Sequence, residues 1–198
     1  VGSEMCIRDS LKRNQITIRA VQDISFTIKR GSIVGFIGSN GAGKSTTIKM
    51  LTGTLYPSSG KLEVNGEIPF KRSINFRKKI SIVVGNKLQL FQDVSAMDYF
   101  QLIGTLYEVE PAILQERIQE LSNLLNVKDQ LYQQVRTLSL GQKMKMEFIA
   151  ASLTSPEILF LDEPTIGLDI QSKKDIRTFL KKMNEECHTT ITVSYTHL

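Results

Sequence analysis

Short apolar runs separated by longer stretches with helical spacing dominate the hydrophobic pattern of this chain. Apolar runs at Ile33–Ile37, Ile80–Val84 and Ile158–Leu161 predict buried strands, and Thr189–Val193 predicts a last one. Runs with few polar interruptions are typical of strands that are covered on both faces, as in a parallel sheet.

Helices are expected between these strands. A short helix follows the first strand over Thr46–Leu51, and a longer one is expected over Ile170–Asn184. Three more are expected in the middle of the chain: one over Ser95–Tyr107 with Ser95 as N-cap, one opened by Pro111, and one over Gly141–Leu153. Strands that alternate with helices predict a parallel, doubly wound sheet, here interrupted by a helical insert.

The first part of the chain has a different pattern. Apolar residues alternate over Leu11–Ile28, which favours short strands. Lys61–Val64 indicates another strand, which ends at the turn Asn65–Gly66. We therefore expect short strands both before and after the first helix.

A glycine-rich segment with the pattern G-x-x-x-x-G-K-S lies between the first strand and the first helix. Glycines let backbone N–H groups converge on an anion, and the helix N-terminus adds a partial positive charge. Lys44 has the reach to contact β- and γ-phosphates, and the Ser45 hydroxyl is a candidate Mg²⁺ ligand. The alternative, a glycine turn beside a surface lysine, does not account for the complete pattern in this context. The candidate phosphate-binding residues are Gly38, Ser39, Asn40, Gly41, Ala42, Gly43, Lys44, Ser45 and Thr46.

Two carboxylates end the apolar strand Ile158–Leu161. An aspartate in this place helps to hold Mg²⁺ in phosphate-loop NTPases, so Asp162 is a candidate metal ligand. Glu163 follows and is the candidate catalytic base, which would orient and deprotonate a water aimed at the γ-phosphate. An acidic strand end that caps the next helix is the alternative, and the phosphate loop upstream makes it the weaker one.

A second potential anion site lies at the start of the third helix of the insert. Ser139 and Gly141 would place a hydroxyl and backbone N–H groups at a helix N-terminus. Alone, this segment is only a good helix cap. Its order and spacing relative to the other motifs give it more weight.

Taken in order, four motifs resemble the nucleotide-binding domain of ABC transporters. They are the phosphate loop, Leu138–Gln142, Phe160–Thr165 and Gly167–Asp169. The resemblance covers about residues 11–192 and is closer to ATPase subunits of bacterial export systems of the daunorubicin or sodium-extrusion type. It implies a phosphate-loop NTPase fold: a RecA-like parallel α/β core (11–85 and 152–192), an N-terminal antiparallel β subdomain and an inserted α-helical subdomain (86–151).

The resemblance also implies a function and its partners. Two such domains pair head to tail around two ATP, each with Mg²⁺, and drive a separate integral membrane permease from the cytoplasmic face of the cell membrane. Asp169 couples the two sites, and Phe91, Tyr99 and Phe100 are candidate contacts of the insert, although a core position is as consistent with each. The signature residues that would bind the partner's ATP are Ser139, Leu140, Gly141 and Gln142.

The sequence departs from the family pattern at three places. Asn86 stands where the family has a glutamine that contacts Mg²⁺, and Gln89 is a fallback out of position. The switch histidine should fall at Thr196, whereas His197 comes one residue later, and a shift of one residue turns a side chain to another side. No aromatic residue that could stack on adenine precedes Phe26. We therefore expect this chain to bind ATP weakly and hydrolyse it poorly.

Composition excludes few alternatives. The chain has 198 residues and a formal charge of +5, with basic clusters that favour a solvated surface over a nucleic-acid site. Of two cysteines, Cys6 lies within residues 1–10, which are interpreted as translated adapter DNA. The single remaining cysteine, Cys187, fits a reducing compartment. A soluble ABC-type ATPase acting on nucleic acid or ribosomes is the alternative function, with a nonenzymatic scaffold as a third. Nucleic acid is the less favoured partner, because the interval Lys44–Ser139 leaves no room for a long coiled coil.

The two ends of the chain are suspect. Met5–Asp9 can be encoded by a DNA string whose reverse complement encodes Val193–His197. Such a string resembles a sequencing adapter, so residues 1–10 and 193–198 are interpreted as translated adapter and excluded from fold reasoning. We therefore expect that this sequence lacks both natural ends of the protein.

Overall fold

The fold is built on a parallel sheet. The computed structural model describes residues 20–195, in which four strands pair in the order β1-β4-β3-β2. The strands are β1 (Ile33–Ile37), β2 (Ile80–Val84), β3 (Ile158–Asp162) and β4 (Thr190–Tyr195), and every neighbouring pair is parallel. All four carboxyl ends therefore meet at one edge of the sheet, which is where ligands bind in open α/β folds.

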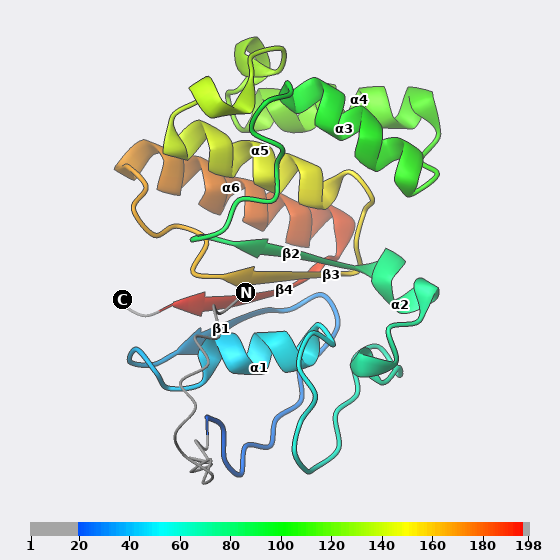
Figure 1. Ribbon diagram of the computed structural model, residues 1–198, viewed down its shortest axis with the longest axis vertical. Helices are drawn as coiled ribbons and strands as arrows, with labels where there is room; N and C mark the ends of the chain where they lie inside the picture. The colour runs from blue at the N-terminus through cyan, green and yellow to red at the C-terminus, as the bar shows by residue number, and fades with distance from the viewer. Residues whose placement is uncertain (1–19, 196–198) are drawn as a thin grey trace, which may run out of the picture.

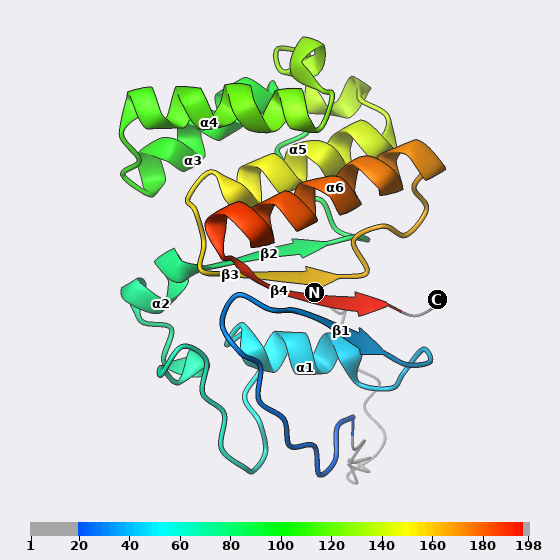
Figure 2. The same cartoon turned by 180° about the vertical axis from the view of Figure 1, so that it is seen from behind.

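Helices cover both faces of the sheet. Figures 1 and 2 show α1 on one face, α5 and α6 on the other, and α3 and α4 stacked outside α5. The α-helices are α1 (Lys44–Leu51), α2 (Ile74–Lys79), α3 (Ala96–Leu106), α4 (Pro111–Leu124), α5 (Leu140–Ser152) and α6 (Ile170–Cys187). Single 3₁₀ turns are η1 (Pro69–Lys71), η2 (Lys128–Gln130) and η3 (Val135–Thr137). None of the helices in the described part of the chain has the length and apolar character needed to cross a membrane.

Strand β3 is apolar up to its last residue, Asp162, because both of its faces are buried. Leu159 and Leu161 belong to the large core cluster under α5 and α6, whereas Phe160 belongs to the smaller cluster under α1. Successive strand side chains point to opposite faces, which explains this division. The rings of Phe148 in α5 and Phe179 in α6 pack edge to face, with their centroids 5.7 Å apart, and connect the two helices above the sheet.

The predicted strands and helices of the parallel core are confirmed, with ends that shift by a few residues. Ser95 caps α3 in a capping box with Asp98, and Pro111 is the first residue of α4. Strand β4 runs to Tyr195 and therefore includes Val193–Tyr195, which the match between the two ends predicts to be adapter. The origin of the two ends stays a prediction.

The N-terminal antiparallel β subdomain does not form among residues 20–195. Residues 20–32 contain no strand, and Lys61–Val64 contributes only an isolated antiparallel bridge from Val64 to Glu67. The predicted turn does form, with left-handed backbone at Asn65 and Gly66. A two-stranded hairpin is marginal without a further strand or a helix to pack on, so the turn forms without extended strands. The strand expected before residue 20 lies outside the described residues.

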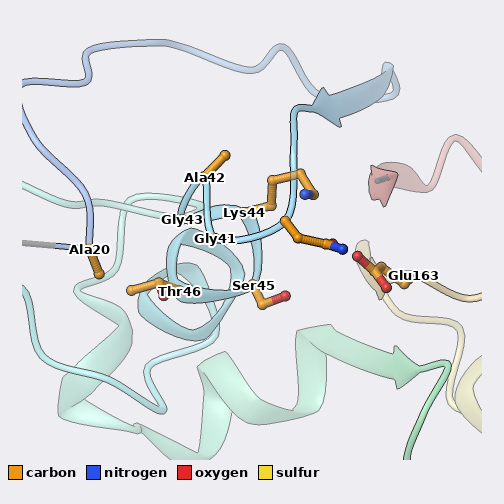
Figure 3. Close-up of a pocket in the computed structure, with 9 residues that line it drawn as sticks. Ala20, Gly41, Ala42, Gly43, Lys44, Ser45, Thr46 and Glu163 are labelled. Carbon is orange, nitrogen blue, oxygen red and sulfur yellow. The ribbon is translucent and has the colours of Figure 1, made fainter. Parts of the chain in front are cut away.

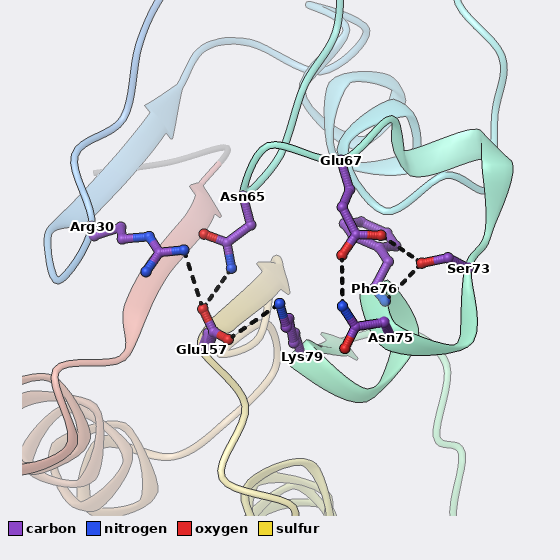
Figure 4. Close-up of polar contacts among 8 residues, drawn as sticks. All are labelled: Arg30, Asn65, Glu67, Ser73, Asn75, Phe76, Lys79 and Glu157. Atoms are coloured by element: carbon purple, nitrogen blue, oxygen red, sulfur yellow. Dashed lines mark hydrogen bonds and ion pairs between the residues drawn. The ribbon is translucent and has the colours of Figure 1, made fainter.

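Polar contacts tie the strands together at the amino edge of the sheet. The Glu157 carboxylate, just before β3, accepts a hydrogen bond from Asn65 at 2.7 Å (Figure 4). It also pairs with Arg30 at 3.5 Å, before β1, and with Lys79 at 3.8 Å, before β2. These contacts lie at the opposite end of the strands from the carboxyl edge and leave that edge to the candidate site.

Candidate functional site

A glycine-rich loop connects β1 to α1 at the carboxyl edge of the sheet. Gly41 and Gly43 have φ of +82° and +86°, a conformation that L side chains rarely adopt. A Cβ on Gly43 would also lie 2.5 Å from the carbonyl oxygen of Ala20. Gly43 is the N-cap of α1 and provides no side-chain acceptor. The first amides of α1 are therefore available to an anion, as the sequence predicts for a phosphate loop.

Lys44 is folded back onto the loop that precedes it. Its Nζ donates to the carbonyl oxygens of Gly38 and Ser39, both at 2.8 Å, and the residue is 9% exposed. The loop encloses a cavity of about 210 Å³ (Figure 3). The predicted residues Asn40 to Thr46 line it together with Ala20 and Glu163. The structure thus brings most of the predicted phosphate-binding residues to one cavity, and their binding of phosphate stays a prediction.

Asp162 joins the end of β3 to the start of α1. Its Oδ1 accepts hydrogen bonds from Ser45 Oγ at 2.8 Å and from Ser194 Oγ at 2.6 Å. A hydroxyl and a carboxylate side by side are oxygen ligands of the kind that Mg²⁺ prefers. No group of three or more His, Cys, Asp or Glu side chains able to hold a metal occurs within residues 20–195. This donor set fits Mg²⁺, which binds through one or two protein oxygens with phosphates and waters completing its shell.

Glu163 lies across the cavity from the phosphate loop (Figure 3). Its backbone is held from both sides in a left-handed conformation, φ +49°. Its N–H donates to Ser194 Oγ at 3.0 Å, and a Cβ on Gly85 would collide with its carbonyl oxygen. The Gly85 N–H also donates to Asp162 O at 2.9 Å. β2 and β4 therefore fix where the candidate base stands.

Ser194 and Gly85 are site residues that sequence reasoning missed. Ser194 is fully buried and contacts both acidic residues of the site. It lies directly opposite Asp162 in the β3–β4 register. Ser194 falls within residues 193–198, which are interpreted as adapter, and this is the first reason that it was missed. Its partner also depends on strand order and register, which the sequence pattern does not determine.

The loop after β2 carries Asn86, which is exposed and follows Gly85 directly. Gln89, the fallback for the family glutamine, uses its side chain elsewhere: Nε2 donates to the Ile82 carbonyl oxygen at 3.0 Å. Gln89 is therefore engaged with β2, and Asn86 remains the candidate at this position.

The Ser139–Gln142 segment begins α5. Ser139 Oγ accepts from the Gln142 N–H at 3.2 Å, and Gln142 Oε1 accepts from the Ser139 N–H at 2.9 Å. Gly141 packs so closely on the start of α6 that a Cβ would collide with Ser172 Oγ. The segment does not line the phosphate cavity of its own chain. Its assignment to a partner's nucleotide stays a prediction.

Asp169 is the N-cap of α6. Its carboxylate accepts from the Ser172 N–H at 2.8 Å and from Ser172 Oγ at 2.6 Å. The hydroxyl hydrogen bond first, and then the backbone ones, lower the pKa of Asp169. The side chain therefore has a structural task in its own chain, and its coupling role across a dimer stays a prediction.

The three aromatic candidates of the insert divide between surface and core. Phe91 is 56% exposed and meets Tyr99 edge to face at 5.3 Å. Phe100 is fully buried in the large core cluster, so it is wrong as a surface contact, because helical spacing places it on the buried face of α3. Thr196 and His197, the positions considered for the switch histidine, lie outside the described residues.

Comparisons with known proteins agree with this geometry. The profile of the ABC transporter family matches residues 21–166. The chain is 33% identical to the ABC transporter ATP-binding protein NatA of Bacillus subtilis (strain 168), over 90% of this chain and 72% of that protein. It is 34% identical to the linearmycin resistance ATP-binding protein LnrL of the same organism, over 89% of this chain and 55% of LnrL. The chain thus spans little more than half the length of some curated relatives.

Two solved structures are similar in fold. CbiO1 from Clostridium perfringens, part of the ABC transporter complex CbiONQ, superposes with a TM-score of 0.78 at 28% identity, over 90% of this chain and 72% of CbiO1. The ATP-binding cassette MJ0796, a dimer in a post-hydrolysis state bound to ADP and Pi, superposes with a TM-score of 0.80 at 23% identity. The match covers 94% of this chain and 84% of MJ0796. The second likeness concerns the fold alone.

Proposed function

The chain belongs to the ABC transporter family of ATP-binding domains, and from that premise we propose that it is the ATP-hydrolysing subunit of a membrane exporter. One observation carries the proposal above the others. The hydroxyl of Ser45, at the start of α1, lies 2.8 Å from Asp162 Oδ1, at the end of β3, although 117 positions separate them in the chain. This contact assembles a phosphate loop and a metal-binding carboxylate into one site.

The residues around the cavity divide the work of binding ATP. Amides of the glycine-rich loop and the α1 N-terminus would bind the phosphate oxygens. Lys44 would exchange its two carbonyl contacts, at Gly38 and Ser39, for phosphate oxygens. Both contacts are to neutral acceptors, so a phosphate is the stronger partner for the ammonium group.

Hydrolysis requires a water aligned with the γ-phosphate. We assign its activation to Glu163, whose backbone is held by Ser194 and Gly85. Ser45 and Asp162 would hold Mg²⁺, which when bound neutralises charge on the transferred phosphoryl group. A general base positioned in this way contributes roughly 10²–10⁴ in rate.

A head-to-tail dimer would complete each site. Three apolar residues around the signature segment are exposed: Leu140, Ile166 and, at 76% exposure, Ile170. They flank Ser139 at the start of α5 and Asp169 at the start of α6. An exposed apolar group rimmed by polar side chains favours a protein interface. This supports Ser139–Gln142 as the segment that closes over the partner's ATP, with Asp169 at the contact.

The proposal extends to a permease partner and a place in the cell. We assign residues 86–151 as the helical subdomain that meets an integral membrane permease, with Phe91 exposed on its surface and Tyr99 half-buried beside it. Residues 11–85 and 152–192 are assigned as the core. One relative is named as the SkfA peptide export ATP-binding protein SkfE of Bacillus subtilis (strain 168), which supports export. The subunit would act at the cytoplasmic face of the cell membrane.

Lysine 44 offers the direct test of this function. Lys44→Ala is expected to weaken MgATP binding at least about tenfold, because the loss of a charged hydrogen-bond donor costs about 1.5–3 kcal/mol. Titration of the purified protein with a fluorescent ATP analogue measures the affinity. Lys49→Ala is the matched control, since Lys49 lies in the same helix and is exposed. Equal affinities in the two variants would contradict the assignment.

Co-purification tests the type of system. Affinity purification from solubilised membranes should recover an integral membrane protein with several spanning helices. Recovery of ribosomes or DNA instead would favour the soluble, nucleic-acid-associated alternative.

A further inference from the structure

A carboxylate in the middle of α5 is buried away from the nucleotide cavity. Glu147 is 4% exposed, although glutamate is almost never fully buried without a partner. It forms no ion pair within residues 20–195. Burial raises its pKa, and hydrogen bonds from Leu90 and Gln89 lower it in part. Those two hydrogen bonds are therefore what offsets its burial.

Both partners of Glu147 are backbone amides of the loop that follows β2. Oε1 accepts from the Leu90 N–H at 2.8 Å and also from the Gln89 N–H. Leu90 is itself buried in the large core cluster. One oxygen thus accepts from two neighbouring amides, of which the Leu90 amide is buried and would otherwise lack an acceptor.

The same loop is anchored to the candidate active site at its other end. The Gly85 N–H donates to Asp162 O at 2.9 Å, and Gly85 packs directly on the carbonyl of Glu163. Asn86 follows Gly85. The loop of residues 85–90 therefore contacts the acidic end of β3 at one end and α5 at the other.

Helix α5 connects the loop of residues 85–90 to the signature segment. It begins at the Ser139 cap, and Lys145 forms an ion pair of 2.5 Å with Asp175 of α6, with both side chains about nine-tenths buried. α5 and α6 are therefore joined firmly, and a movement of the loop at residues 89–90 would be passed to the helix as a whole.

We propose that Glu147 is a positioning residue that couples the loop of residues 85–90 to α5, so that a change at Asn86 on nucleotide binding reaches Ser139. The inference rests on the proposed ATP-binding function. Its structural part, the connection between α5 and the two amides, is independent of that function. The two parts are therefore tested by separate measurements.

Amide hydrogen exchange tests the connection in the whole chain without nucleotide. Glu147→Leu replaces the carboxylate with an apolar side chain of similar size and removes the hydrogen-bond acceptor. Amide exchange at Gln89 and Leu90 should therefore become about tenfold faster or more. Glu147→Gln keeps a carbonyl acceptor and should retain most of the protection. Glu116→Leu is the matched control, because Glu116 is exposed on α4. Unchanged exchange at both amides in Glu147→Leu would overturn the proposal.

A second measurement tests transmission, with a non-hydrolysable ATP analogue and Mg²⁺ at protein concentrations where sedimentation shows a monomer. The analogue should change exchange over residues 139–142 in the parent and in Glu147→Gln, and the change should disappear in Glu147→Leu. Affinity for the analogue should stay within about twofold, since the phosphate loop is untouched. A response that persists in Glu147→Leu, or that the parent lacks, would refute the coupling. Failure of the parent to bind the analogue would instead contradict the proposed function.

Discussion

Individual hydrogen bonds at the carboxyl edge of the sheet determine how Asp162 and Glu163 are oriented. Asp162 accepts two hydroxyl hydrogen bonds through one oxygen, from Ser45 and Ser194. Ser194 also accepts the Glu163 N–H, so a single buried hydroxyl orients both acids. Hydrogen bonds to charged groups contribute about 1.5–3 kcal/mol each, which makes Ser194 a residue of measurable effect.

Replacement of Ser194 tests this role. Ser194→Ala is expected to lower ATP turnover about tenfold, because Asp162 loses a donor and the Glu163 amide loses its acceptor. Ser194→Thr keeps the hydroxyl and should retain most of the activity. Steady-state phosphate release measures the effect.

Ser152→Ala is the control for that series. Ser152 is also buried, but its hydroxyl has no hydrogen-bond partner within residues 20–195. Its removal should leave turnover within about twofold of the parent. If Ser194→Ala behaves like Ser152→Ala, the hydroxyl does not position the acids.

Packing between elements depends on two glycines that bring backbones together. Gly85 lets β2 approach the end of β3, and Gly141 lets the start of α5 approach the start of α6. At Gly141 the neighbours are Ser172 and Asp169, the capping pair of α6. Both helix starts named in the proposed dimer contact therefore depend on one another within the chain.

Gly141→Ala is expected to destabilise the fold by about 1–3 kcal/mol, the usual cost of inserting a methyl group into a well-packed site. Urea unfolding measures the free energy of unfolding. In a double-mutant cycle, Ser172→Ala should remove part of this penalty, because the hydroxyl oxygen is the atom that the new methyl would meet. Strictly additive effects would show that the two residues do not clash.

The molecule as a whole places its nucleotide cavity and its signature segment on different parts of one chain. The phosphate loop lies beside α1 on one face of the sheet, while Ser139 begins α5 on the other (Figures 1 and 2). The signature residues do not line the cavity. In the proposed head-to-tail dimer, the signature segment of a second copy would line each cavity.

Blocked hydrolysis should therefore accumulate a dimer. Glu163→Gln is expected to abolish turnover while preserving ATP binding, so that MgATP shifts the variant from monomer to dimer in analytical ultracentrifugation. The reason is that ATP would favour the paired state and hydrolysis would release it.

The double variant Lys44→Ala Glu163→Gln is the control for this experiment and should remain monomeric with MgATP, since it lacks the lysine that contacts the phosphates. A Glu163→Gln protein that stays monomeric at saturating MgATP would argue against ATP-driven pairing. Undiminished turnover in that variant would remove Glu163 from the role of base.

Local chemistry allowed much of this protein to be predicted. The phosphate loop depends on glycines and a lysine at fixed spacing beside a strand and a helix, and the caps of α3 and α5 depend on residues three positions apart. Apolar runs were sufficient for the parallel strands because both faces of such strands are buried. These features require only neighbours along the chain.

Features that depend on pairing between distant segments required the three-dimensional structure. Ser194 meets Asp162 only through the β3–β4 register, and Glu147 meets the loop after β2 only through the packing of α5 on the sheet. The N-terminal strands predicted from alternation do not form among the described residues, since alternation provides no partner. Contact between residues far apart in sequence is decided by strand order, register and helix packing, and the hydrophobic pattern of a single segment contains none of these.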